Sequence, residues 1–209
     1  MSVFIIAEAG VNHNGSKEMA FQLIDAAKKA GVDAVKFQTF KTDNLVTKNA
    51  DKAAYQKKTT SSDKSQFDML KKLELEYETF HELFDYCNNN EIEFLSTAFD
   101  FESLNFLVND LRLKTLKIPS GEITNLPLIR HLSSSGKPII LSTGMASLAE
   151  VESAIDLIET SGTPRERITL LHCTTEYPAP VDEVNLRAMV TMKQTFNLNV
   201  GYSDHTNKI

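Results

Sequence analysis

KTLKIPSGE, residues Lys114–Glu122, is a short apolar run that carries a lysine in its middle and breaks at a proline. Read as a β-strand, its alternation places Leu116 and Ile118 on one face and Lys117 on the other. An ammonium group in such a strand is costly to desolvate unless an anionic group meets it. The SGE run after the break adds a hydroxyl, backbone amides and a carboxylate. A lysine that simply reaches solvent explains this one strand equally well.

The same arrangement recurs along the chain of 209 residues. We expect six more strands, at Val3–Ala7, Ala34–Gln38, Glu93–Ala98, Pro138–Ser142, Ile168–Cys173 and Leu198–Ser203. Amphipathic segments between them predict helices at Lys17–Ala30, Tyr77–Asn89, Phe101–Asp110, Leu126–Ser134, Leu148–Thr160 and Val184–Phe196. Strands that alternate with helices predict parallel βα units and an α/β fold.

Polar side chains end nearly every predicted strand, which favours a (β/α)8 TIM-type barrel over an open doubly wound sheet. In a barrel all the carboxyl ends of the strands meet at one rim, where active sites lie, whereas in an open sheet only those at the switch point meet a ligand. A complete barrel has eight strands, so we expect residues 1–209 to form an N-terminal barrel domain truncated after strand 7.

One connection departs from this regular pattern. Residues Phe40–Glu76 are polar, and we expect a single helix within them, at Gln66–Leu73. A connection of this length inside a βα unit is usually functional or mobile, so it predicts an excursion over the site. A tolerated surface insertion is the alternative.

The composition excludes some classes of partner. Lys and Arg number 22 against 28 Asp and Glu, a net charge of -6, so no basic footprint indicates nucleic acid or a membrane surface. Cys87 and Cys173 stand apart in no metal-binding spacing, and Val3–Ala7 is far too short for a signal peptide. We therefore expect a cytoplasmic protein.

Two lysines, Lys36 and Lys117, would point to the predicted rim. Two cations in a low-dielectric site repel each other unless an anion lies between them, so a phosphate or carboxylate ligand is expected. Hydroxyls at neighbouring strand ends would donate to the same anion. A buried lysine could instead form a Schiff base with a carbonyl substrate.

Two kinds of group that could move protons or bind a metal also fall at strand ends. His205, in the run SDHT, could ligate a divalent metal or act as acid or base, although a hydrogen-bonded histidine is the simpler reading. Glu8 and Glu122 are candidates for proton transfer, or could pair with the lysines.

In this order the residues resemble the N-acetylneuraminate (sialic acid) synthase family, which includes synthases of legionaminic and pseudaminic acids. Seven runs carry the resemblance: IIAEAGVNHNG (Ile5–Gly15), AVKFQTF (Ala34–Phe40), FLSTAFD (Phe94–Asp100), KIPSGEITNLPL (Lys117–Leu128), GKPIILSTGM (Gly136–Met145), LLHCTTEYPAP (Leu170–Pro180) and VGYSDHT (Val200–Thr206).

The resemblance implies a transferase that condenses phosphoenolpyruvate with an N-acetylated hexosamine, such as N-acetylmannosamine, and releases phosphate. It implies a divalent metal cofactor, with Mn²⁺ expected and Mg²⁺ or Co²⁺ as alternatives, and a homodimer for the full-length protein. In the family a second metal-binding histidine lies on strand 8, and a C-terminal antifreeze-like domain completes the partner's site. Both would lie beyond Ile209, so we expect the 209-residue chain alone to be inactive or nearly so.

Residue roles follow from the same resemblance. The expected catalytic residues are Glu122, Lys117, Lys36 and His205, of which Glu122 would move protons and His205 would bind the metal. The residues expected to hold phosphoenolpyruvate are Lys36, Thr97, Lys117, Ser120, Ser142 and Ser203. The remaining substrate-binding residues are Glu8 and Tyr177, which would face the sugar, together with Gln38 and Thr175. Thr175 stands where some members have asparagine.

Two other functions fit the residues taken without the resemblance. A Schiff-base aldolase or lyase would use Lys36 or Lys117 covalently and would not respond to a chelator. A non-catalytic sugar-phosphate binding domain would keep the lysines but would not need Glu122 and His205.

Overall fold

The computed structural model describes residues 3–48, 50 and 65–207 of the chain. Their contacts divide the chain into two compact units, Met1–Leu113 and Lys114–Ile209, called here the N-terminal and C-terminal units. Seven parallel strands follow one another in chain order, from β1 to β7. A doubly wound sheet would reverse its strand order at a switch point. The uninterrupted order is that of a TIM-type barrel up to its seventh strand, as predicted.

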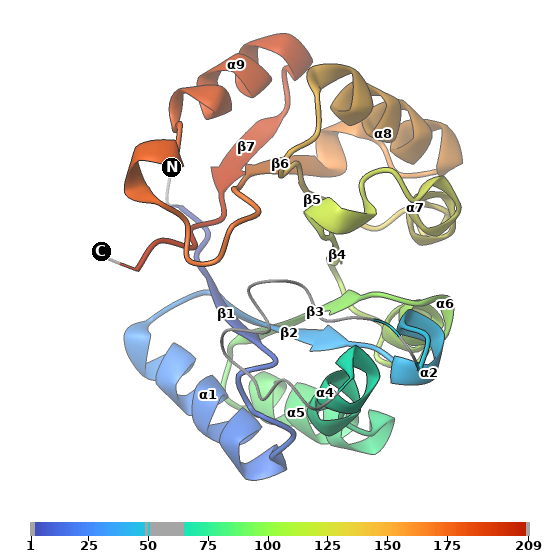
Figure 1. Cartoon of the computed structure of the whole chain (residues 1–209), viewed down its shortest axis with the longest axis vertical. Helices are drawn as coiled ribbons and strands as arrows, with labels where there is room; N and C mark the ends of the chain where they lie inside the picture. The colour runs from blue at the N-terminus through green and yellow to red at the C-terminus, as the bar shows by residue number, and fades with distance from the viewer. Residues whose placement is uncertain (1–2, 49, 51–64, 208–209) are drawn as a thin grey trace. The chain divides into compact units, whose positions relative to one another are not determined.

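The N-terminal unit contains three of the strands: β1 (Ile6–Gly10), β2 (Ala34–Thr39) and β3 (Glu93–Ala98). β2 pairs with both of its neighbours in parallel, with Glu8 opposite Lys36 and Gln38 opposite Thr97. Its helices are α1 (Lys17–Ala30), α2 (Thr42–Leu45), α4 (Gln66–Leu73), α5 (Tyr77–Asn89) and α6 (Phe101–Asn105). Of these, α1 and α5 lie side by side and pack against the strands (Figure 1).

The C-terminal unit contains β4 (Leu116–Ile118), β5 (Ile139–Ser142), β6 (Ile168–His172) and β7 (Asn199–Tyr202). Each strand pairs in parallel with the next. The helices α7 (Leu126–Ser133), α8 (Leu148–Ser161) and α9 (Arg187–Phe196) alternate with the strands, and α7 packs against α8 (Figure 1). Short 3₁₀ turns lie at Ser120–Glu122, Arg165–Arg167 and Val181–Glu183.

Local sequence explains the best-defined helices. The Ser16 hydroxyl accepts a hydrogen bond from the Met19 N–H at the start of α1, and Gly31 ends that helix with a φ of 75°. Ser147 and Glu150 form a capping box at the start of α8. None of the helices in the described residues is long and apolar enough to cross a membrane.

Most of the predicted elements agree with the structure to within one residue at each end, and three elements differ by more. β1 begins and ends three residues later than predicted, because the chain pairs with β2 from Ile6 onward and leaves Val3–Ile5 largely exposed. α9 begins at Arg187 rather than Val184, after a 3₁₀ turn. The predicted helix Phe101–Asp110 is α-helical only to Asn105 and continues as a π-helical turn, Phe106–Asp110.

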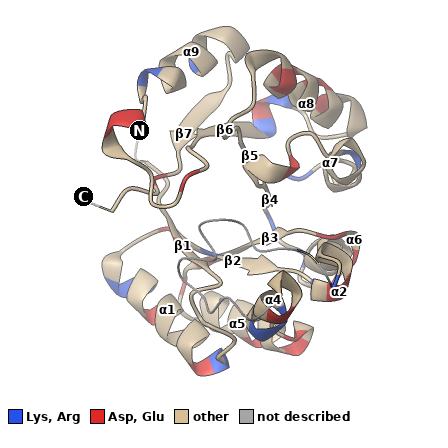
Figure 2. Cartoon of the chain, viewed as in Figure 1, with Lys and Arg blue, Asp and Glu red and all other residues tan. Residues whose placement is uncertain are grey.

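Charged residues gather on helices and connections, and the strands are largely tan in Figure 2. Lys36 in β2 and Lys117 in β4 are exceptions, since they are only 8% and 7% exposed. A buried ammonium group needs hydrogen-bond partners to offset its desolvation, so the surroundings of these two lysines define the candidate site.

Candidate active site

The first cluster, called the Lys36 cluster, comprises Lys36, Glu8 and Thr97 in the N-terminal unit. The Lys36 Nζ lies 2.6 Å from a carboxylate oxygen of Glu8 and donates to the Thr97 hydroxyl at 3.2 Å. The strand register produces this arrangement, because Glu8 stands opposite Lys36 on the neighbouring strand. In the structure, Glu8 therefore forms an ion pair with Lys36. The side chain of Glu8 is 40% exposed, so its carboxylate remains accessible to solvent.

The second cluster, called the Lys117 cluster, comprises Lys117, Ser142 and Ser120 in the C-terminal unit. The Lys117 Nζ donates to the Ser142 hydroxyl and to the backbone carbonyl of Ile118, both at 2.7 Å. Hydrogen bonds of this length from a cation are short and fix the position of the amine. These two partners are neutral oxygens, whereas Lys36 has a carboxylate.

Two turns of the C-terminal unit approach each other closely near the Lys117 cluster. One turn contains Ser120, after β4, and the other contains Gly144, two residues after Ser142. Gly144 has a φ of 51°, and a Cβ atom placed there would lie 2.6 Å from the Cβ of Ser120 and 3.0 Å from a methyl carbon of Thr175. Thr143 fixes the second turn to β6, since both its N–H and its hydroxyl donate to the Leu171 carbonyl.

A third cluster, called the His205 cluster, forms where β7 ends. His205 Nε2 lies 3.2 Å from the Ser203 hydroxyl. The rings of His205 and Tyr177 are nearly perpendicular, and their centroids lie 4.3 Å apart. The His205 carbonyl accepts from the Ala179 N–H at 2.8 Å, which fixes the segment after β6 to the segment after β7. The structure thus brings together Ser203, His205 and Tyr177, which lie in two different runs of the sequence.

The remaining predicted residues lie in less enclosed surroundings. Glu122 is half-buried and accepts a hydrogen bond from the Asn125 side-chain amide at 2.7 Å. Gln38 is also half-buried, and Thr175 is exposed. A carboxylate that is partly hydrated and singly hydrogen-bonded can exchange protons with a ligand or with water.

The start of the long connection is fixed both to the rest of the N-terminal unit and to the connection's own end. At its start, the Lys41 N–H donates to Asp100 and the Thr42 N–H donates to Glu74, both at 2.9 Å. The Lys41 amine also lies 4.2 Å from the centre of the Tyr77 ring. The predicted helix at Gln66–Leu73 is confirmed as α4, and α2 was not predicted. Residues 49 and 51–64 of this connection lie outside the described part.

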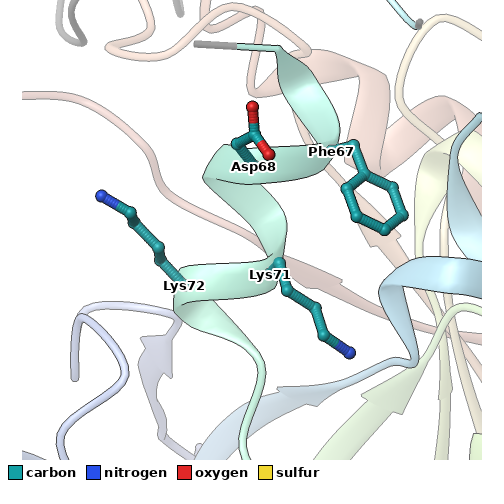
Figure 3. A pocket seen from close by; sticks show the side chains of 4 residues that line it. All are labelled: Phe67, Asp68, Lys71 and Lys72. Atoms are coloured by element: carbon teal, nitrogen blue, oxygen red, sulfur yellow. The ribbon is translucent and has the colours of Figure 1, made fainter. Parts of the chain in front are cut away.

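A hollow of about 410 Å³ lies beside α4, lined by Phe67, Asp68, Lys71 and Lys72 (Figure 3). None of these is a predicted site residue. The Lys71 amine lies 3.1 Å from Glu74 and 3.5 Å from Asp43, and the Glu74 hydrogen bond raises the pKa of Lys71. Because this helix surface is open and its lysine is already paired with carboxylates, we assign it no catalytic role.

The sequence matches the profile of the NeuB family over residues 23–209, nearly nine-tenths of its length. The chain belongs to the NeuB family. The N,N'-diacetyllegionaminic acid synthase of Campylobacter jejuni is 55% identical to it over 205 residues, which cover 98% of this chain and 61% of the relative. The enzyme of the same name from Legionella pneumophila is 51% identical over 208 residues, covering 99% of this chain and 58% of the relative.

Solved structures agree with this membership of the NeuB family. The crystal structure of N-acetylneuraminic acid (sialic acid) synthetase from Leptospira borgpetersenii, in complex with citrate, matches with a TM-score of 0.85 and 33% identity. The match covers 100% of this chain and 67% of that one. The chain thus spans about three-fifths of the length of the two curated relatives and two-thirds of the solved one.

A divalent metal, as expected for a NeuB family member, needs several donor side chains that converge on one point. No group of three or more His, Cys, Asp or Glu side chains converges within residues 3–48, 50 and 65–207. His205 supplies one imidazole, and its neighbours Ser203 and Tyr177 are weak ligands for a divalent ion. The described residues therefore do not form a complete metal site by themselves.

Two residues of this NeuB family chain that the structure draws attention to were not among the site residues predicted from the sequence. Gly144 follows the Ser-Thr pair at the end of β5, and that position could have signalled a close backbone approach. His13 is fully buried in the turn after β1, where its Nδ1 accepts from the Gly15 N–H at 3.0 Å. Among the residues that the structure describes, none is a hydrogen-bond partner for its Nε2. Nothing in the sequence around His13 indicates such burial.

Proposed function

We propose that the full-length protein containing this chain condenses phosphoenolpyruvate with an N-acetylated amino sugar to form a nonulosonic acid and phosphate. The observation that carries the proposal is the pair of buried lysines, each within a parallel strand and each hydrogen-bonded to a hydroxyl. In a chain of the NeuB family, such cations are suited to a small substrate with several negative charges. The Leptospira relative was crystallised with citrate, another small multiply charged anion.

Each cluster is assigned a role in holding that substrate. Lys36 and Thr97 are proposed to contact phosphoenolpyruvate. Lys117 is proposed to contact it as well, with hydroxyls that either donate to the anion or hold the lysine in position. The hydroxyl-bearing residues of the C-terminal unit in this set are Ser120, Ser142 and Ser203.

The reaction balances without an oxidant or reductant. C3 of phosphoenolpyruvate attacks the aldehyde carbon of the open-chain sugar, so that a C–C bond forms and the aldehyde oxygen takes up a proton. Water adds to the cationic C2 and loses a proton, and the C2–O bond to phosphate then breaks. The products are inorganic phosphate and a 2-keto acid. The lysines would stabilise the anionic groups in the transition states, and Glu122 would transfer the protons.

The product class is proposed from the two curated relatives. Both are N,N'-diacetyllegionaminic acid synthases and share more than half of the aligned residues with this chain. We therefore propose an acceptor with two acetamido groups over N-acetylmannosamine, which has one. Glu8, Gln38, Thr175 and Tyr177 are the residues proposed to face the sugar.

The metal, the assembly and the domain organisation remain part of the proposal. His205 is proposed as one ligand of a divalent ion, with Mn²⁺ as the first choice, and its remaining ligands lie outside the described residues. A homodimer and a further C-terminal domain are proposed for the full-length protein. We propose that the 209-residue chain alone is inactive or nearly so.

One experiment tests the reaction and the acceptor together. Phosphate release by the full-length protein is measured with phosphoenolpyruvate, Mn²⁺ and a panel of singly and doubly N-acetylated hexoses. We expect release only when both substrates are present, fastest with a diacetamido acceptor, and lost on addition of a chelator. Trapping of pyruvate on a lysine by borohydride, with no effect of the chelator, would instead identify a Schiff-base enzyme.

The role of His205 has a readout that does not need activity. Replacement His205→Ala in the full-length protein should weaken binding of Mn²⁺, measured by calorimetry or electron paramagnetic resonance, by about 100-fold. Replacement of the surface histidine His131, in α7, should leave the affinity unchanged. Equal affinity in the wild type and in His205→Ala would remove His205 from the metal site.

A further inference from the structure

Gly144 lies at the point where three loops of the C-terminal unit come together. It follows Ser142 in the turn after β5, and it faces Ser120 from the turn after β4 and Thr175 from the segment after β6. A Cβ atom at position 144 would stand 2.6 Å from the Ser120 Cβ and 2.9 Å from the Ser120 hydroxyl oxygen. Carbon atoms that are not bonded do not approach so closely, so any side chain at this position must displace Ser120.

The φ of Gly144 adds a second constraint. At 51° it lies in the left-handed region, which residues other than glycine adopt at a cost. The position therefore lacks a side chain for two separate reasons, the conformation of its own backbone and the closeness of Ser120.

We infer that Gly144 is a positioning residue, whose missing side chain lets the turn after β5 set the Ser120 hydroxyl for phosphoenolpyruvate. This inference rests on the function proposed above and adds a residue to it. Gly144 touches no substrate in this scheme and acts through Ser120. It also acts on the Lys117 cluster, because the same turn begins at Ser142, whose hydroxyl accepts from Lys117 at 2.7 Å.

A matched control separates the two constraints on the glycine. Gly31 has a φ of 75°, also in the left-handed region, but a Cβ atom there would meet nothing within 4 Å. It ends α1 in the N-terminal unit, outside all three clusters. Gly31→Ala thus imposes the backbone cost alone, whereas Gly144→Ala imposes the backbone cost together with the displacement of Ser120.

The experiment compares the two variants in the full-length protein. We expect Gly144→Ala to raise the KM for phosphoenolpyruvate, and its Kd from calorimetry, about tenfold, with a much smaller change in the KM for the sugar. Gly31→Ala should lower the melting temperature but leave both KM values and the Kd as in the wild type. A merely structural role of Gly144 would lower the melting temperature without this difference between the two substrates.

Two backgrounds test whether the effect passes through Ser120. Ser120→Ala keeps the Cβ atom at 2.6 Å and removes only the rotatable hydroxyl, so Gly144→Ala should still lower the melting temperature there by most of the amount seen in the wild type. Ser120→Gly removes that atom, and the cost should fall to about half or less, since the Thr175 methyl group at 3.0 Å is then the nearest neighbour. Equal costs in the two backgrounds would overturn the inference.

The outcomes distinguish this inference from the proposed function. If the wild type binds phosphoenolpyruvate but releases no phosphate with any acceptor, the proposed function fails and the Kd still decides the role of Gly144. If the wild type is active and Gly144→Ala matches Gly31→Ala in KM and Kd, only the inference fails. If the wild type does not bind phosphoenolpyruvate, both fail.

Discussion

The Lys36 cluster and the Lys117 cluster each bury the amine of a lysine that lies within a strand, but they hold it differently. Lys36 has a carboxylate oxygen of Glu8 at 2.6 Å and a hydroxyl at 3.2 Å. For Lys117, a hydroxyl and a backbone carbonyl both lie at 2.7 Å. An anion that approaches Lys36 must share the amine with the Glu8 carboxylate, which already offsets part of its charge. Because two short hydrogen bonds fix the Lys117 amine, we expect a bound anion to gain more from Lys117 than from Lys36.

The largest expected effect is the loss of the Lys117 amine. Lys117→Met in the full-length protein should lower kcat/KM for phosphoenolpyruvate by about 10³-fold or more, because a bound anion then loses its buried cation. Lys36→Met should cost about 100-fold, because Glu8 already offsets part of that charge. Steady-state phosphate release measures both, and a larger loss for Lys36→Met would reverse the comparison.

The ion pair of the Lys36 cluster predicts a rescue. Lys36→Met leaves the Glu8 carboxylate without its ammonium partner, so Glu8→Gln added to it should restore about 1 kcal/mol of unfolding free energy. The side chain of Glu8 is 40% exposed, and solvent screening limits the effect to this size. Urea unfolding of the wild type, the two single variants and the double variant measures the coupling. Additive losses would mean that the pair contributes no stability.

The hydroxyl partners sharpen the comparison further. Ser142→Ala should raise the KM for phosphoenolpyruvate about tenfold, because the Lys117 amine loses a short hydrogen bond of 2.7 Å. Thr97→Val removes the longer hydrogen bond of 3.2 Å from the Lys36 amine and should raise the KM for phosphoenolpyruvate about threefold. Ser153→Ala on α8, outside all three clusters, serves as the matched control for loss of a serine hydroxyl and should leave KM unchanged.

The smallest expected effect concerns the stability of the N-terminal unit at low pH. Burial lowers the pKa of His13 below its usual 6.5. As the pH falls through 6.5, His13 therefore binds a proton in the unfolded chain but not in the folded chain. The free energy of unfolding is accordingly highest above pH 6.5 and decreases as the pH falls below it. His13→Gln should flatten the dependence of unfolding free energy on pH between 7 and 5. An unchanged slope in urea titrations would contradict this.

Sequence predicted the elements best where local signals define both ends. The bounds of α1 are as predicted, since Ser16 and Gly31 supply the caps within the chain segment itself. The β1 boundary was wrong, because Val3–Ala7 has the composition of a strand but pairing with β2 starts only at Ile6. The residues of β1 alone do not determine where its pairing with β2 begins. The π-helical turn Phe106–Asp110 likewise has no local signal that a helical pattern would reveal.

The candidate residues were predicted from their position at strand ends, and their partners were not. The alternation in each strand predicted which face Lys36 and Lys117 occupy, whereas their burial depends on the cover of both faces of the strands. That Ser142 holds Lys117, or that Tyr177 contacts His205, depends on which segments the topology brings together. Close approaches such as that of Gly144 depend on distances between loops of about an atomic diameter, which pattern alone cannot supply.

Gly15, in the turn that also holds His13, has a φ of 78°, and a methyl group there would overlap the backbone carbonyl of Lys72 in α4. A backbone carbonyl cannot rotate away as a side chain can, so the last turn of α4 and the turn after β1 must keep one fixed spacing. A change in length between α4 and α5 that moves the end of α4 would therefore disturb this close approach. An engineer who replaces this connection would need to retain Gly15 together with the carboxyl end of α4.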